Sequence, residues 1–256
     1  MVLLTFLPSS QCNATGLKTG VEEKLGRIVP RDLTFFDETG SQVSLETLIK
    51  KPTIISLVYF SCSHTCPLLL GSLAESLGKM GLDPGNDYQV LTLSFDEKDR
   101  PQAALQKKKN YLAAAGSGFP EASWRFLTGS EENIRKLTEA VGFPFKREKG
   151  GFSHPKVLVF LSGEGKVVRY LYGTNSRPFD IRMALAESAE GQSSVSFDGL
   201  LLFSYRYDSG ENRYFFNLLK VLGAVLLFTA TSLSVLALAA RHGGGSRKKG
   251  VITGEM

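Results

Sequence analysis

The chain has 256 residues, of which 43% are hydrophobic and 21% charged, and its formal net charge is +5. This length is enough for one hydrophobic core with roughly a hundred residues to spare. The basic residues are scattered or lie in the C-terminal tail, and no basic groove with interleaved aromatic residues is present, so nucleic-acid binding is not predicted. Only three cysteines occur, which excludes a disulfide-stapled scaffold and leaves one reactive or metal-binding pair, Cys62 and Cys66.

The N-terminal segment, residues 1–20, contains an apolar run at residues 2–7 that is shorter than the hydrophobic part of a usual signal peptide. No positive residue precedes this run. We interpret the segment as the remnant of an export signal. Cys12 lies within it and is expected outside the folded domain.

The following residues, 21–192, predict an α/β domain. Strands are expected at residues 33–36, 42–44, 53–60, 88–95 and 124–128, with two more between 156 and 172. Helices are expected at residues 45–50, 67–81, 101–115, 130–142 and 178–190, with Ser44 and Asp99 as candidate N-caps. A parallel crossover through the helix after the cysteines, together with a late antiparallel hairpin, predicts a sheet covered by helices on both faces. Trp124 is expected in the core, and Lys107, Lys108 and Lys109 on a solvated helix face.

The C-terminal part predicts a membrane anchor. Residues 221–240 are apolar apart from Thr and Ser, and about 20 residues at about 1.5 Å each span the hydrocarbon core of a bilayer. We expect a transmembrane helix at 217–241 in contact with lipid, preceded by an aromatic juxtamembrane connector at 193–216. The basic residues of the tail, 242–256, favour a cytoplasmic C-terminus. The cysteine domain of this single-pass inner-membrane protein would then face the periplasm or another extracytoplasmic space.

The cysteine pair lies where a buried strand passes into a helix. We expect both thiols on the first helical turn, where unpaired N–H groups and the helix dipole make them more acidic than free thiols. Side chains at positions i and i+4 have Cβ atoms about 5–6 Å apart on a helix, whereas a disulfide needs about 3.5–4.5 Å. A metal ion between the two sulfurs therefore suits the spacing at least as well as a disulfide.

A metal site needs a third ligand, and the chain has three histidines. His242 abuts the predicted membrane span, and His64, between the cysteines, is expected to point away from their common face. His154 lies in a loop directly before a strand that is expected to be central in the sheet, beside the strand that precedes the cysteines. This loop can approach the cysteine turn, which makes His154 the candidate ligand.

Three blocks of sequence together resemble the Sco/SenC family of copper chaperones. The first is Tyr59-Phe60-Ser61-Cys62-Ser63-His64-Thr65-Cys66-Pro67, which matches a strand ending in Y-F-x-C-x-x-x-C-P. The second, Ser94 to Pro101, nearly matches a strand followed by S-x-D-x-x-x-D-x-P. The third is His154 before a strand and a glycine-containing hairpin. The resemblance implies a thioredoxin-like fold and copper binding by Cys62, Cys66 and His154.

Two features depart from the family pattern. Many members have Asp directly before the histidine, where this chain has Ser153, so the usual carboxylate partner of the histidine is absent from that position. Many members also carry their anchor at the N-terminus, whereas this chain resembles a bacterial branch with a C-terminal anchor.

The ligand chemistry is consistent with this resemblance. Two thiolates and one imidazole suit three-coordinate Cu(I), while structural zinc would require a fourth protein ligand. Our leading hypothesis is a membrane-anchored metallochaperone, not an enzyme, that carries Cu(I) or Cu(II) and assists assembly of the copper centre of cytochrome c oxidase. Its partner would be an oxidase subunit or another cuproprotein.

Two alternatives use the same cysteines. A thiol–disulfide reductase would cycle a redox-active Cys62–Cys66 disulfide to keep the cysteines of a target protein reduced, and it would not need His154. A thioredoxin-fold peroxidase would need one acidic peroxidatic cysteine, which the paired C-x-x-x-C spacing disfavours.

Overall fold

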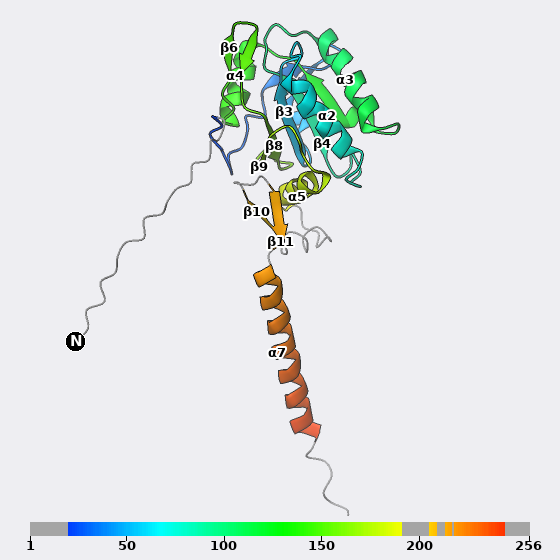
Figure 1. Ribbon diagram of the computed structural model, residues 1–256, viewed down its shortest axis with the longest axis vertical. Coiled ribbons are helices and arrows are strands. Elements are labelled where there is room, and N and C mark those ends of the chain that lie inside the picture. The colour runs from blue at the N-terminus through cyan, green and yellow to red at the C-terminus, as the bar shows by residue number, and fades with distance from the viewer. Residues whose placement is uncertain (1–19, 191–204, 209–212, 217, 244–256) are drawn as a thin grey trace, which may run out of the picture.

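The computed structural model describes residues 20–190, 205–208, 213–216 and 218–243 (Figure 1). Within the first range the strands are β1 (Thr34–Phe36), β2 (Gln42–Ser44), β3 (Thr53–Val58), β4 (Gln89–Ser94), β5 (Trp124–Leu127), β6 (Lys146–Glu148), β7 (Gly151–Ser153), β8 (Val157–Leu161) and β9 (Val167–Tyr172). The helices are α1 (Leu45–Leu48), α2 (Thr65–Leu77), α3 (Pro101–Ala115), α4 (Glu131–Ala140) and α5 (Pro178–Ala189), with a 3₁₀ turn at Glu121–Ser123. The predicted N-terminal segment with Cys12 and most of the basic tail lie outside the described residues.

The centre of the domain is a five-stranded mixed sheet in the order β5-β4-β3-β8-β9. Strands β3, β4 and β5 are parallel to one another, and β8 runs antiparallel to β3 and to β9. The predicted parallel crossover through α2 and the late antiparallel hairpin are both confirmed. Because β3 and β8 are neighbours, the segment after the end of β3 and the segment before the start of β8 meet at one edge of the sheet.

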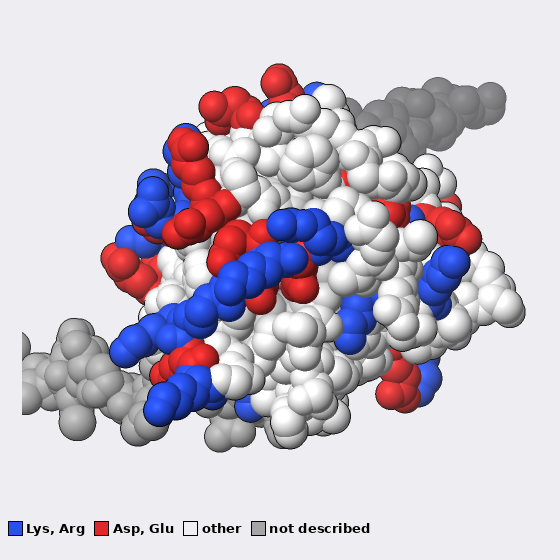
Figure 2. Space-filling view, turned by 90° about the horizontal axis from the view of Figure 1, so that it is seen from above, with Lys and Arg blue, Asp and Glu red and all other residues white. Residues whose placement is uncertain are grey.

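Helices cover both faces of this sheet, as predicted (Figure 1). All six residues of β3 are buried, and their side chains alternate between the two faces. Ile54 and Val58 pack with residues of α2, α3 and α5, whereas Ile55 and Leu57 pack with α1 and α4. Trp124 is fully buried, as expected. On the face turned away from α7, acidic and basic side chains lie side by side (Figure 2).

Most predicted elements are present, but their ends differ. Strand β3 stops at Val58 and α2 at Leu77, because the residues that follow each form turns. Ser44 caps α1 as expected, by accepting a hydrogen bond from the Thr47 N–H. Asp99 does not cap α3: the N-cap position belongs to Arg100, and the Asp99 carboxylate binds elsewhere. The expected loop around residue 150 is partly a hairpin, formed by β6 and β7.

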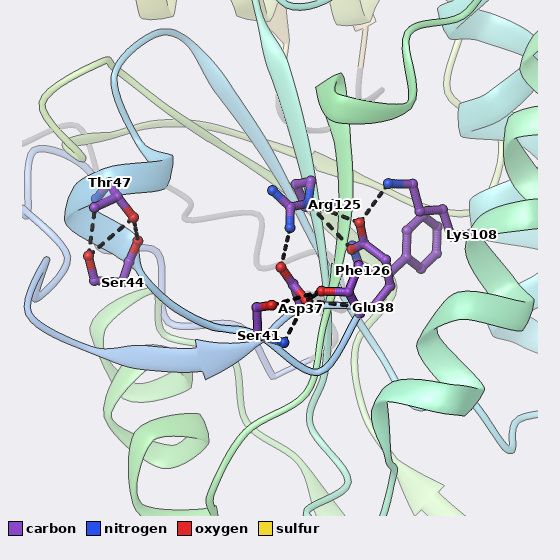
Figure 3. Close-up of polar contacts among 9 residues, drawn as sticks. Asp37, Glu38, Ser41, Ser44, Thr47, Lys108, Arg125 and Phe126 are labelled. Carbon is purple, nitrogen blue, oxygen red and sulfur yellow. Dashed lines mark hydrogen bonds and ion pairs between the residues drawn. The ribbon is translucent and has the colours of Figure 1, made fainter.

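The prediction that Lys108 lies on a solvated face is wrong. Lys108 is only 6% exposed, and its Nζ lies 2.6 Å from Glu38 Oε1. Arg125 is half-buried and binds the carboxylates of both Glu38 and Asp37, so the four charged groups form one network (Figure 3). Both acidic residues belong to the turn after β1, which no periodicity of α3 could indicate. Lys109, by contrast, is exposed.

The C-terminal part contains a hairpin, β10 (Tyr205–Asp208) and β11 (Arg213–Phe216), within the predicted connector. It is followed by the long helix α7 (Leu218–Gly243), drawn in orange to red (Figure 1). When only the residues with a described placement are considered, no helix has both the length and the apolar character needed to cross a membrane.

Candidate metal centre

The two cysteines occupy different positions at the start of α2. Cys66 lies in the first turn of the helix, whereas Cys62 belongs to the preceding turn, in which its N–H donates to the Tyr59 carbonyl at 3.2 Å. The expectation that both thiols lie on the first helical turn therefore holds for Cys66 alone. Pro67 follows directly, since a proline fits the first helical turn, where the N–H is not needed. Both cysteines are free and nearly buried, at 5% and 4% exposure.

Cys62 is the acidic member of the pair. Burial raises the pKa of the Cys62 thiol, but the backbone N–H groups of Cys66 and His64 and the Tyr59 hydroxyl lower it by more, so that the pKa of Cys62 is about 6. The neighbouring Cys66 side chain also lowers the pKa of Cys62. Near neutral pH the sulfur of Cys62 is therefore a thiolate, the form that binds soft metal ions and attacks disulfides.

Cys66 contradicts the expectation that both thiols are acidic. Burial raises the pKa of Cys66, and the neighbouring Cys62 sulfur raises it further to about 12, although the Tyr59 backbone N–H opposes this. Two neighbouring thiolates repel each other, so the thiol of Cys66, whose pKa burial already raises, keeps its proton. A helix N-terminus alone does not predict this outcome, since the spacing cannot show how deeply each sulfur is buried.

The loop with His154 approaches the cysteine turn as predicted, and its contact there is with Cys66. Its Nε2 lies 4.0 Å from Cys66 Sγ, although the two residues are 88 positions apart. Its Nδ1 lies 2.9 Å from the Pro155 carbonyl oxygen. Because a carbonyl only accepts, Nδ1 carries the proton and Nε2 presents its lone pair to the sulfur. Burial lowers the pKa of His154, which favours the neutral imidazole that a metal requires.

The Pro155 carbonyl performs the orienting role that the sequence left open. Many proteins with this motif have a carboxylate directly before the histidine, and this chain has Ser153 there. Here the backbone of the next residue fixes the tautomer of His154 instead. Carbonyl oxygens and carboxylates both serve as hydrogen-bond acceptors for metal-binding histidines. With Ser153 at this position, the Nδ1 atom of His154 still has a hydrogen-bond acceptor, and Nε2 still faces Cys66.

Aromatic rings enclose the imidazole. Phe95 lies 5.0 Å from the His154 ring centroid, Tyr59 5.8 Å and Phe143 6.0 Å, and the Tyr59 ring is nearly perpendicular to it. Phe152, from the same hairpin, packs on Tyr59 and Phe95. These rings limit the motion of His154 and lower the local dielectric, which favours the uncharged imidazole.

The second sequence block connects to the cysteine turn. Asp99 Oδ2 accepts hydrogen bonds from the Phe60 backbone N–H at 2.7 Å and from the Ser94 hydroxyl at 2.6 Å. The loop after β4 thereby holds the chain two residues before Cys62. From the sequence, Asp99 was recognised as part of the second block but was predicted to cap α3. Its real partner, the Phe60 N–H, is 39 residues away and could not be predicted from neighbouring residues.

The same loop also holds the histidine hairpin. Arg147, on β6, places its guanidinium 2.8 Å from Asp96 Oδ1 and 2.8 Å from Glu97 Oε1, and it stacks over the Phe152 ring at 4.3 Å. The sequence analysis missed Arg147, since it gave no prediction of the hairpin. One loop, residues 95–100, thus contacts the supports of both the cysteines and the histidine.

The other predicted residues behave as follows. His64 is exposed, and its Nδ1 lies 2.8 Å from the Ser63 hydroxyl. The side chain of His242 is not among those described. No group of three or more His, Cys, Asp or Glu side chains within the described ranges is arranged to hold a metal ion. Binding by all three residues, Cys62, Cys66 and His154, therefore stays a prediction, while the Cys66–His154 pair is formed.

The match to a known family covers the whole of the domain that holds these residues. The sequence model of the SCO1/SenC family matches residues 22–189 of the 256. The chain belongs to the SCO1/SenC family. The predicted thioredoxin-like α/β fold of this family is confirmed by its solved relatives.

Two curated proteins are similar in sequence to this Sco chain. The SCO1 protein homolog of Bacillus subtilis (strain 168) is 24% identical over 164 residues, which cover 61% of this chain and 80% of that protein. A candidate copper-binding protein of Stutzerimonas stutzeri is 28% identical over 120 residues. That match covers 46% of this chain and spans 54% of the relative's length.

Among solved structures, a candidate electron transfer protein from Aquifex aeolicus VF5 is 32% identical, with a TM-score of 0.60. The match covers 68% of this chain and 99% of that one. Arabidopsis thaliana ScoI with copper bound is 23% identical, with a TM-score of 0.52, over 62% of this chain and 96% of that one. The second likeness shows the shared fold alone.

Proposed function

We propose that this Sco protein binds copper through Cys62, Cys66 and His154 and delivers it to a cuproprotein. The observation that carries the proposal is the Cys66 Sγ to His154 Nε2 distance of 4.0 Å, with Nδ1 of the same ring held by Pro155. A dithiol that only exchanges disulfides does not require an imidazole with its lone pair turned to a buried sulfur. Such an imidazole is what a soft metal ion needs.

The donors fit copper chemically. Thiolate and neutral imidazole are the ligands that Cu(I) prefers, and Cys62 already carries a thiolate near neutral pH. Two ligands of one three-coordinate ion, each bonded at about 2.0–2.3 Å, lie roughly 3.7 Å apart. The observed 4.0 Å is close to this value, so Cys66 and His154 need only a small movement to share one copper ion.

The supports of the ligands suggest how copper could be released. Cys62 lies in a turn, and His154 follows a short hairpin, so the two belong to separate segments joined through the loop at 95–100. Separation of the hairpin from the turn would remove the imidazole and leave a two-sulfur site open to a partner. As the target we propose a subunit of cytochrome c oxidase or another cuproprotein. Family membership and the copper-related names of relatives support this role.

The copper proposal is tested with the reduced full chain in competition with a chromogenic Cu(I) chelator. Cys62→Ser and Cys66→Ser should each lower the affinity at least about a hundredfold, because each removes one of two soft donors. Cys12→Ser, at the third cysteine, is the matched control and should leave the affinity unchanged. Equal affinity in all three variants would refute a copper site at this cysteine pair.

We also propose that residues 217–241 anchor the protein in the inner membrane, with the cysteine domain outside the cytoplasm. The apolar composition of 221–240 supports this proposal, as does the exposure of Leu226, Leu227 and Phe228, each 68–73% accessible on α7. Protease added to intact spheroplasts should digest the cysteine domain and spare an epitope placed after Arg247. Protection of the cysteine domain instead would refute this topology.

A thiol–disulfide reductase is the second candidate, and the unequal cysteines favour it. A thiolate at Cys62 beside a protonated Cys66 matches the attacking and resolving thiols of a reductase. A reductase should reduce a disulfide in a target peptide equally well with His154→Ala. The same change should weaken Cu(I) binding about tenfold and Cu(II) binding at least about a thousandfold.

A further inference from the structure

The hairpin of β6 and β7 leads directly into His154, but it is not part of the central sheet. Among the described strands, β6 and β7 pair only with each other, as a sheet of two strands. Figure 1 shows β6 near α4 at the rim of the domain, and a groove of about 410 Å³ lies between them. Phe145 and Phe152 line this groove on the hairpin side, and Ile134 and Thr138 line it on the side of α4. Side-chain contacts, rather than pairing with the central sheet, therefore keep the hairpin in place.

Arg147, on β6, joins the hairpin to the loop after β4. Its Nη2 lies 2.8 Å from Asp96 Oδ1 and 2.8 Å from both Oε1 and Oε2 of Glu97. The Asp96 side chain is only 9% exposed, whereas the side chains of Glu97 and Arg147 are 34% and 44% exposed. One carboxylate of this ion pair is thus buried, which strengthens the attraction, while the guanidinium remains open to solvent and salt.

The same guanidinium lies over a ring that leads to the histidine. Arg147 and Phe152 are paired across the hairpin, and Arg147 Cζ lies 4.3 Å from the Phe152 ring centroid. Phe152 packs on Phe95 at 5.2 Å, and the Phe95 ring lies 5.0 Å from the His154 ring. The ion pair therefore fixes the hairpin on one side of this stack of rings, and through the stack it fixes the imidazole.

We infer that Arg147 is a positioning residue, and that its ion pair with Asp96 and Glu97 is a latch that sets how fast copper leaves. The inference rests on the proposed function, in which His154 is a ligand. With the latch closed, the imidazole stays beside Cys66. With the latch open, the hairpin can move away with the imidazole and leave the ion on two sulfurs. Because the latch is ionic and half-exposed, salt weakens it, whereas salt does not weaken the aromatic contacts of the hairpin.

The test loads the reduced full chain with one Cu(I) and measures its transfer to an excess of chromogenic chelator, under conditions where dissociation limits the rate. Arg147→Ala should raise this rate about fivefold, because loss of one partner of a partly buried ion pair acts mainly on dissociation. Arg147→Lys keeps the charge but not the planar guanidinium, so its rate should lie between the two. Lys146→Ala is the matched control. It removes an exposed positive charge from the same strand, and the rate should not change.

Three further measurements separate a latch from a general loosening of the fold. In the His154→Ala background the latch no longer holds a ligand, so Arg147→Ala should not raise the release rate further. In the metal-free chain, Arg147→Ala should speed the hydrogen exchange of residues 146–153 and leave that of β8 unchanged. A rise in salt from about 0.05 M to about 0.5 M should speed release from the unmodified chain but not from Arg147→Ala.

Glu97→Gln weakens the same ion pair from the side of the loop, and it decides the result if Arg147→Ala does not fold. Unchanged release in both variants overturns the inference and leaves the copper site intact. An equal rise with and without His154 does the same, because Arg147 would then act on the whole fold. Failure of the unmodified chain to bind copper overturns the proposed function, and this inference with it.

Discussion

Cys66 and His154 are 88 residues apart in the chain, yet Cys66 Sγ lies 4.0 Å from His154 Nε2. The sheet order explains this contact. Because β3 and β8 are antiparallel neighbours, the segment after one and the segment before the other lie at the same edge. The loop at 95–100 then holds both segments, through Asp99 at the cysteine turn and through Asp96 and Glu97 at the hairpin.

Copper binding should release protons in a number that depends on pH. Near pH 7.5 Cys62 is a thiolate because its pKa is about 6, while Cys66, with a pKa of about 12, keeps its proton. Binding of one Cu(I) by both sulfurs should therefore release about one proton, and the apparent affinity should rise about tenfold per pH unit. Below pH 6 the release should approach about two protons. Calorimetry in buffers of different ionisation enthalpy measures this number, and a release of two protons at pH 7.5 would show that Cys62 is not a thiolate.

The stability of the reduced protein should also depend on pH through Cys62. Its pKa is lowered from 9.0 to about 6 in the folded protein, so the unfolded chain binds more protons between these values. Stability should then rise from pH 6 to pH 9 and be lost as the pH falls through 6. Cys66, whose pKa is raised to about 12, has the opposite effect only above pH 9. Urea unfolding under reducing conditions should show the rise in the natural chain and not in Cys62→Ser. A rise of equal slope in the variant would assign it to other groups.

Asp99→Ala should destabilise the cysteine turn. The buried N–H of Phe60 would lose its acceptor, at a cost of about 1–3 kcal/mol in the free energy of unfolding. Asp99→Asn keeps an acceptor oxygen and should cost less. Glu75→Ala removes a solvent-exposed ion pair with Lys79 and should change stability much less than Asp99→Ala does. Denaturant unfolding compares the three variants, and equal effects of Asp99→Ala and Glu75→Ala would remove the role assigned to Asp99.

Lys108→Ala should be among the most destabilising changes in α3, because Lys108 is buried. It leaves the buried carboxylate of Glu38 with Arg125 as its remaining cationic partner, and we expect a loss of about 3 kcal/mol. Lys109→Ala, one residue further along the same helix, removes an exposed charge and should cost less than about 0.5 kcal/mol. Thermal or denaturant unfolding of the two variants is the direct comparison. Similar stabilities would show that the buried ion pair contributes nothing.

The sequence was sufficient for the elements with strong local signals. The apolar runs at β3 and β4 are long and continuous, and α4 begins at the capping residue Ser130, so these elements were predicted nearly whole. His154 was identified from its place before a central strand. Its hydrogen bond to the Pro155 carbonyl was not predicted, because every residue has a backbone carbonyl and the residue type does not show which one is used.

The rest depended on distant contacts. The burial of Lys108 follows from Glu38, 70 residues earlier, and the protonation of Cys66 follows from its depth beneath Cys62. The hairpin of β6 and β7 is short, and β6 is exposed along its length, so it shows no apolar alternation. It is held by Arg147 and by aromatic packing, which only the folded chain reveals.

The central claim, copper binding by His154 together with the cysteines, is tested most directly by comparing two histidine variants of the full chain. His154→Ala should weaken Cu(I) binding moderately, by about tenfold, and Cu(II) binding by at least about a thousandfold, since imidazole matters more to the harder ion. His64→Ala removes an exposed imidazole that lies between the two cysteines in sequence, and it should change neither affinity. If His154→Ala left both copper affinities unchanged while disulfide reduction persisted, the metal site would be refuted and the reductase would take its place.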